Sequence, residues 1–438
     1  MPNAAAPQLL QFEFPRIAAA SEATSGHLSP ADTDFAAAMV AARAAVARLR
    51  ETAVNGDSEC PEREAVLGAS QLLQSYSTDR PSSHLFRLLR LASRFRDSVD
   101  RILVLANAGQ QELIQVLLDS CCDPYFNQLS RGQRGSRPRI TLISTPFDVD
   151  DAEGVVQLLG KHPGQSDVES QWGLIAMREH DGQPELDHAM EFFTEKLWKQ
   201  FGTVGRRDRC IVIAQPSDPW HASALRQDCQ AVVEPRYSPL HRWGATQMHA
   251  TGILMVAGLL GIDLVKLLAG ASHVGRQFLD TQETEHPSEP FVEAQVACRL
   301  CSSEAFPEYR PDVRALHSYA IWCERQYRAI RRGSATNTGI GAGQELAGAG
   351  QSNRLAMRCG RPMQPMPLQT IVHVERWRYR APNHVELPLS PGLFGVTTAR
   401  GCRTTRICLP CVHEGTIGQL LAVSLLAMAA EFPVHPPA

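Results

Sequence analysis

The chain has no strong net charge and no long apolar run. Its 438 residues carry 43 lysines and arginines against 46 aspartates and glutamates, which gives a net charge of −3 at pH 7. No overall electrostatic field therefore attracts nucleic acid or an anionic membrane. The longest apolar stretches, 252–260 and 420–430, are shorter than the roughly 20 residues that span a bilayer. We expect a protein that binds neither nucleic acid nor membrane.

The N-terminus lacks the features of a secretory signal. Residues 1–23 have no basic segment followed by an unbroken apolar one. The 12 cysteines are scattered over a long chain, whereas a disulfide scaffold concentrates them in a short one. We therefore expect a cytoplasmic protein with reduced thiols, and no motif indicates a cofactor.

The length is enough for two or three domains, and the sequence divides into three parts. Residues 1–96 contain three helical patterns, the last with a basic stripe that is typical of a solvated face. Residues 97–250 form a first α/β domain, in which four apolar runs alternate with helical patterns. Such runs are typical of strands buried on both faces of a parallel sheet, and they cover 101–106, 139–144, 172–177 and 210–214. The predicted fold class is α/β, a three-layer αβα sandwich with a parallel sheet.

The third part, residues 251–438, shows the same pattern in reduced form. Residues 251–271 indicate buried helices broken near Gly261, residues 369–374 a strand and residues 416–431 an apolar helix. The glycine-rich segment 333–350 follows a helical pattern and lacks the lysine of a phosphate-binding P-loop. We expect a second, eroded α/β domain here.

Several of these segments resemble the glucose-6-phosphate isomerase family, in particular its divergent bacterial members. Residues 104–136 (VLANAGQQELIQVLLDSCCDPYFNQLSRGQRGS) are similar to the family's first sugar-binding segment. Residues 252–271 are similar to its GLLPAAVAGID-type helix, and residues 409–419 (LPCVHEGTIGQ) to its LPRLDEHALGQ-type stretch. The resemblance implies the sugar isomerase (SIS) fold and the interconversion of glucose 6-phosphate and fructose 6-phosphate, a step of glycolysis and gluconeogenesis.

The family's catalytic groups are missing at the matching positions. Ala329 stands where the family has its general base, and the position of the ring-opening histidine lies near Gln351. The C-terminal lysine of the family has no counterpart, because no lysine follows Lys266. Loss of one acid or base group costs about 10²–10⁴ in rate. We therefore assign no catalytic residue and expect an impaired isomerase homologue.

The positions that contact sugar and phosphate in the family have also changed. The family's glycine-rich turn corresponds to residues 106–110, and its phosphate loop to residues 178–183 (REHDGQ). That loop has no hydroxyl side chain, and Glu179 and Asp181 would repel a phosphate. We expect a hexose phosphate to bind weakly at most, at degenerate positions that the resemblance assigns as Gly109, Gln110, Arg178, Gly182, Gln183 and Arg242.

Two Cys-x-x-Cys pairs have the spacing of zinc half-sites. They are Cys298 with Cys301 and Cys408 with Cys411. The pairs lie far apart in the sequence, and neither is in a glycine-rich knuckle. We expect unligated thiols and no metal, with a zinc site as the alternative.

Three functional hypotheses remain open. The first is a pseudoenzyme that binds a carbohydrate derivative or acts as a partner module, as a homodimer or beside an active relative. The second is an active isomerase with displaced groups, using Glu345 or Glu375 as base and His373 or His413 for ring opening. The third is a sugar-phosphate sensor, which must still bind phosphate.

Overall fold

A computed structural model of the chain describes residues 10–13, 30–56, 60–143, 149–160, 168–178, 184–226, 229, 231–233, 247–280, 292–297, 308–311, 313–336, 368–374, 403–409 and 411–431. The chain divides into two compact units, one of residues 71–268 and one of residues 1–70 with 269–438. The finer division at 96/97 and 250/251 stays a prediction. Within the described residues, no helix is both long and apolar enough to cross a membrane.

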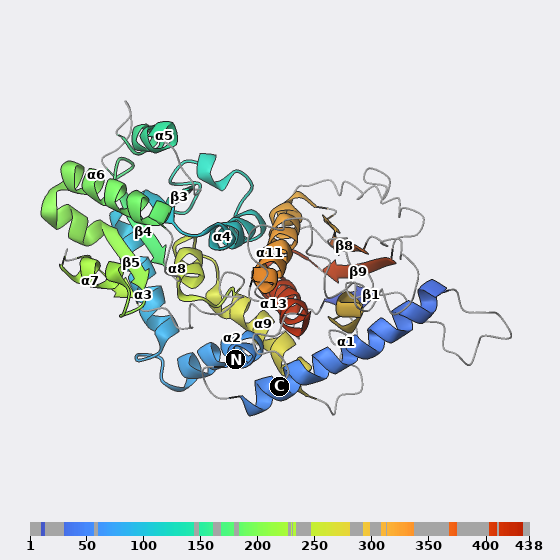
Figure 1. The fold of residues 1–438 in the computed structure, drawn as a ribbon. Helices are drawn as coiled ribbons and strands as arrows, with labels where there is room; N and C mark the ends of the chain where they lie inside the picture. The colour runs from blue at the N-terminus through green and yellow to red at the C-terminus, as the bar shows by residue number, and fades with distance from the viewer. Residues whose placement is uncertain are drawn as a thin grey trace, which may run out of the picture. The chain divides into compact units, whose positions relative to one another are not determined.

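The unit of residues 71–268 is built on a five-stranded parallel sheet (Figure 1). Its order is β3-β2-β4-β5-β6. The strands are β2 (Arg101–Leu105), β3 (Arg139–Ile143), β4 (Trp172–Arg178), β5 (Cys210–Ala214) and β6 (Ala231–Val233). The four predicted apolar runs form β2 to β5 and are parallel, so the predicted α/β fold class is confirmed.

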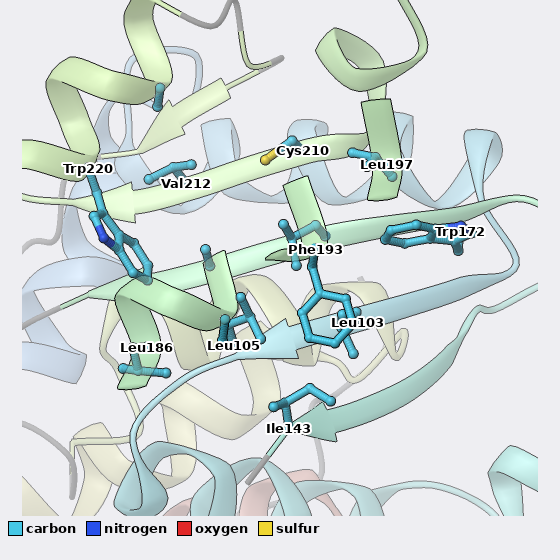
Figure 2. Close-up of a cluster of buried hydrophobic side chains, with 14 of the residues drawn as sticks. Leu103, Leu105, Ile143, Trp172, Leu186, Phe193, Leu197, Cys210, Val212 and Trp220 are labelled. Carbon is cyan, nitrogen blue, oxygen red and sulfur yellow. The ribbon is translucent and has the colours of Figure 1, made fainter. Parts of the chain in front are cut away.

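Helices cover both faces of this sheet. One face packs against α5 (Val149–Leu159), α6 (Pro184–Arg209) and α7 (Pro219–Arg226). Alternate residues of the strands, among them Leu103, Leu105, Trp172 and Val212, meet these helices in one apolar cluster, to which α6 contributes Phe193 (Figure 2). Every residue of β2, β4 and β5 is buried, as expected of strands covered on both faces, and the charged residues in these strands are Arg101 and Arg178 at their ends.

The other face of the sheet packs against α3 (His84–Ser98) and α8 (Thr251–Leu259). Gly173 leaves room for the Phe95 ring, and Gly252 leaves room for the Met177 side chain, since a Cβ at either glycine would collide with it. The contact between Gly252 and Met177 fixes the first turn of α8 against the last part of β4. The predicted break between the buried helices is confirmed, because Gly261 has φ +71° and ends α8 before α9 (Leu264–Leu279).

The strand order creates a topological switch point between β2 and β4. From β2 the chain crosses to β3 on one side, and from β4 it crosses to β5 on the other. The connections that leave the carboxyl ends of β2 and β4 therefore run in opposite directions. In open α/β sheets, ligands bind in the crevice that this divergence leaves.

The other unit contains a smaller sheet of order β1-β9-β8-β7. Its strands β7 (Glu308–Pro311), β8 (Leu368–Val374) and β9 (Arg403–Leu409) are parallel, and β1 (Gln11–Glu13) adds to β9 in the antiparallel direction. The helices of the unit include α1 (Pro30–Asn55), α11 (His317–Thr336) and α13 (Glu414–Glu431), together with α2 (Pro61–Thr78) up to Ser70. In α13 every residue from Thr416 to Ala430 is buried, as expected of a helix that is apolar all round.

Candidate functional site

The first turn of α4 (Ala108–Cys121) lies at the carboxyl end of β2, at the switch point. A capping box closes this turn on itself. Asn107 Oδ1 accepts a hydrogen bond from Gln110 N at 2.9 Å, and Gln110 Oε1 accepts one from Asn107 N at 3.1 Å. The helix N-terminus is therefore capped by its own residues.

The Gln110 amide is only half satisfied by this arrangement. Gln110 is 1% exposed, and the nitrogen of its side-chain amide, Nε2, is buried without a hydrogen-bond partner. Native structures leave few buried polar atoms in this state. Because Oε1 binds Asn107 N, the unpartnered Nε2 also lies beside the first turn of α4. The sequence placed Gln110 among the ligand contacts, and the neighbouring Gly109 is half-buried in the same turn.

Gln111, the next residue, has a different role. Its Nε2 donates to the carbonyl oxygen of Ala106 at 2.7 Å and to that of Ile143. These carbonyls end two neighbouring strands, so the Gln111 side chain joins β2 to β3. The side-chain nitrogen of Gln111 thus has hydrogen-bond partners, whereas that of the preceding residue, Gln110, has none.

Arg178, the last residue of β4, is held by two carboxylates. One guanidinium nitrogen donates to Asp187 on α6. Its Nε lies 3.2 Å from Asp218 Oδ2, which is an ion-pair distance without the alignment of a hydrogen bond. The guanidinium carbon also lies 5.2 Å from the centre of the Trp220 ring, within cation–π range.

Trp220 fixes both carboxylates in turn. Its Nε1 donates to Asp187 at 2.6 Å, and its backbone N–H donates to Asp218 at 2.7 Å. Arg178 and Asp218 are buried, while the Asp187 carboxylate is half-exposed. The network holds one positive and two negative charges, so the end of β4 is net negative.

A further buried amide lies just before α8. Gln247 is 0% exposed, and neither its Oε1 nor its Nε2 has a partner. The helix that follows, α8, begins at Thr251, and its N-cap residue Ala250 makes no side-chain hydrogen bond to the first turn. In that turn, Thr251 Oγ1 lies 3.1 Å from His84 Nε2. Sequence reasoning missed Gln247, because a single glutamine before an apolar helix belongs to no motif.

Other predicted residues fall outside what the structure describes. This holds for Gly182, Gln183, Arg242, Gln351, Glu345, Glu375, Cys298 and Cys301, and for the side chains of Ala329, His373 and Cys408. Cys411 is half-buried, and its carbonyl oxygen accepts a hydrogen bond from Thr416 Oγ1 at 2.7 Å. Within the described residues, no group of three or more His, Cys, Asp or Glu side chains could hold a metal ion.

His413 is described, and it caps α13. Its Nδ1 accepts hydrogen bonds from the backbone N–H groups of Gly415 at 2.9 Å and Thr416 at 3.3 Å. This assigns the proton of the neutral ring to Nε2. The Nδ1 atom of His413 therefore has a structural role as the cap of α13.

Comparisons with known proteins agree with this fold. No protein-family model matches the chain, and no curated protein sequence matches it. A hypothetical protein from Thermus thermophilus matches with a TM-score of 0.59 and 15% identity, over 91% of each chain. A glucose-6-phosphate isomerase from Chlamydia trachomatis matches with a TM-score of 0.61 and 11% identity, over 91% of this chain and 80% of its own.

The chain has the fold of a glucose-6-phosphate isomerase. Identities of 11% and 15% show the fold alone, because one fold hosts many chemistries. The sugar isomerase fold that the resemblance implied is thereby confirmed.

Proposed function

We propose that the protein binds a sugar-type ligand at the carboxyl ends of β2 and β4 and does not interconvert glucose 6-phosphate and fructose 6-phosphate. The main observation against isomerisation of a sugar phosphate is the pairing of Arg178 with Asp187 and Asp218. Arg178 begins the segment that corresponds to the family's phosphate loop. A guanidinium held by two carboxylates has little attraction left for a phosphate dianion.

The absence of the family's catalytic side chains supports the second half of the proposal. Isomerisation needs a base that moves a proton between two carbons, together with groups that open the sugar ring. Ala329 stands at the position of the family's base, and the position of the ring-opening histidine lies near Gln351. Among the residues that the active-isomerase alternative would use instead, His413 uses its Nδ1 atom to cap α13. No observation on the described residues favours the active-isomerase alternative.

The test is a coupled assay that converts fructose 6-phosphate to glucose 6-phosphate and reports the product by its oxidation. The protein is prepared from a host that lacks its own isomerase. We expect no turnover above the blank. Turnover on the order of 10 s⁻¹, a usual enzyme rate, would overturn the proposal.

A partner role is the second candidate, in which the chain associates with itself or with an active relative. The partner role is favoured because the chain has the sugar isomerase fold but lacks the family's catalytic groups. Such a chain can still bind an active relative through its surface. Sedimentation of the purified chain, alone and mixed with an active isomerase from the same cell, tests both forms of association. Sedimentation as a monomer in both samples would exclude them.

A further inference from the structure

We propose that the crevice between β2 and β4 takes an uncharged polyhydroxyl ligand, such as an unphosphorylated hexose or a sugar alcohol, in preference to a sugar phosphate. This rests on the proposed function, because it assumes a ligand at the same strand ends. It goes further by naming the class of ligand.

The first step is the position of the unpartnered amides. Gln110 belongs to the first turn of α4, which follows β2. Gln247 precedes the first turn of α8, which packs against Met177 near the end of β4. β2 and β4 are neighbours in the sheet, and α4 packs against α8. Both amides therefore lie at the same edge of the sheet.

The second step is the chemistry of these groups. Gln110 offers a buried N–H donor, and Gln247 offers a donor and an acceptor, all without partners. The amides are uncharged, and they match a sugar hydroxyl, which both donates and accepts. The first turn of α8 adds backbone N–H groups that no side chain caps. A site that is built to hydrogen-bond hydroxyls leaves its polar atoms unsatisfied when the ligand is absent.

The third step is the local charge. Arg178, Asp187 and Asp218 sum to one negative charge at the end of β4. The first turn of α4, which would otherwise attract an anion, is already closed by Asn107. The Arg178 guanidinium at this edge is thus compensated by its own carboxylates, and the two amides offer hydrogen bonds without charge. Such a site favours a neutral ligand over a dianion.

The ligand test is titration calorimetry of the full chain with fructose, sorbitol and fructose 6-phosphate at equal ionic strength. We expect a neutral ligand to bind at least about tenfold more tightly than the phosphate, which is the effect of one good differential interaction. Tighter binding of the phosphate would overturn the inference, and so would the absence of binding by either neutral ligand. The isomerase assay tests the catalytic half of the proposed function separately, because turnover can be absent whichever ligand the chain binds.

The site test uses Gln247→Met, which keeps the length of the side chain and removes both unpartnered atoms. We expect its melting temperature to rise, because a buried polar group without partners is replaced by an apolar one. We expect its affinity for the neutral ligand to fall by about tenfold or more. A lower melting temperature would show that the amide has partners and would overturn the inference.

Gln111→Met is the matched control, since the same change at a partnered amide should lower the melting temperature. A second variant, Gln110→Glu, keeps the oxygen that accepts from Asn107 N and replaces only the unpartnered nitrogen. It should retain the circular dichroism of the folded chain and lose affinity for the neutral ligand. Unchanged affinity in both Gln110→Glu and Gln247→Met would place the ligand elsewhere.

Discussion

Asp100 and Arg134 form an ion pair in which both side chains are fully buried, with Arg134 Nη2 2.8 Å from Asp100 Oδ1. Asp100 also pairs with the partly exposed Arg131 and Arg139, each at 2.8 Å. Burial lowers the pKa of the Arg134 guanidinium, and the Asp100 charge acts in the opposite direction. The carboxylate thus fastens the segment that precedes β3 to the start of β2.

Asp100→Asn should therefore be strongly destabilising. Asparagine keeps one acceptor oxygen but leaves Arg134 buried without a counter-charge, which costs roughly 3–5 kcal/mol of unfolding free energy. Urea denaturation measures this cost. Arg131→Gln is the control, because Arg131 is partly exposed and its loss should cost about 1 kcal/mol or less. Equal stability of the two variants would show that Asp100 is not the centre of the cluster.

A pair of glycine substitutions separates close packing from helix propensity. A Cβ at Gly270 in α9 would collide with the Gly415 carbonyl oxygen, a backbone atom, whereas Gly154 in α5 has open space around it. Gly270→Ala should lower the melting temperature, through an overpacking cost of about 1–3 kcal/mol. Gly154→Ala should raise it, because alanine stabilises a helix by about 1 kcal/mol over glycine. Shifts of the same sign in both variants would contradict the close approach.

The pH dependence of stability should include a contribution from Tyr319. Burial raises the pKa of this phenol well above its ordinary value of 10.0, while its hydrogen bond with Ser424 at 2.7 Å lowers it. The folded state holds the phenolic proton more tightly than the unfolded chain. This contribution is therefore complete below about pH 10 and is lost as the pH rises above it.

Tyr319→Phe should make the loss of folding stability at high pH less steep. Urea midpoints measured from about pH 8 to about pH 11 would fall less steeply above the ordinary phenol pKa in the variant than in the original chain. Ser424 Oγ keeps its bond to the Leu420 carbonyl at 2.9 Å, so the variant should fold. Parallel curves for the two proteins would show that Tyr319 does not titrate with unfolding.

The sequence predicted those parts of the fold that have a strong hydrophobic pattern. β2 to β5 were found because strands buried on both faces are continuous apolar runs. β1 and β6 are only three residues long, and β7 contains Glu308, Arg310 and Pro311. β9 carries two arginines in seven residues. These strands are specified by their neighbours in the sheet, and their own residues do not reveal them.

The site was predicted less completely than the fold. Gln110 and Arg178 were found through their match to family positions, and both lie at the switch point. The partners of Arg178 were missed, because Asp187 lies on α6 and Asp218 follows β5, and only the fold brings them to β4. Whether a residue at a ligand position is free or already paired is decided by tertiary contacts.

The pairing of Arg178 leads to the last prediction. Asp187→Asn and Asp218→Asn together should release the guanidinium while preserving the acceptor oxygens that bind Trp220. The charge of the network then changes from one negative to one positive. At about 4 Å and an effective dielectric constant near 20, each carboxylate opposes a phosphate by ~4 kcal/mol per unit charge.

We expect the original chain to bind fructose 6-phosphate more weakly than millimolar, and the double variant to bind it at least about tenfold more tightly. Titration calorimetry measures both, with Asp150→Asn and Asp151→Asn in the first turn of α5 as a variant of equal charge change. An equal gain in that control would indicate a general effect of net charge. Micromolar binding by the original chain would show that the paired Arg178 is no obstacle to phosphate, and the sensor hypothesis would then replace the proposed one.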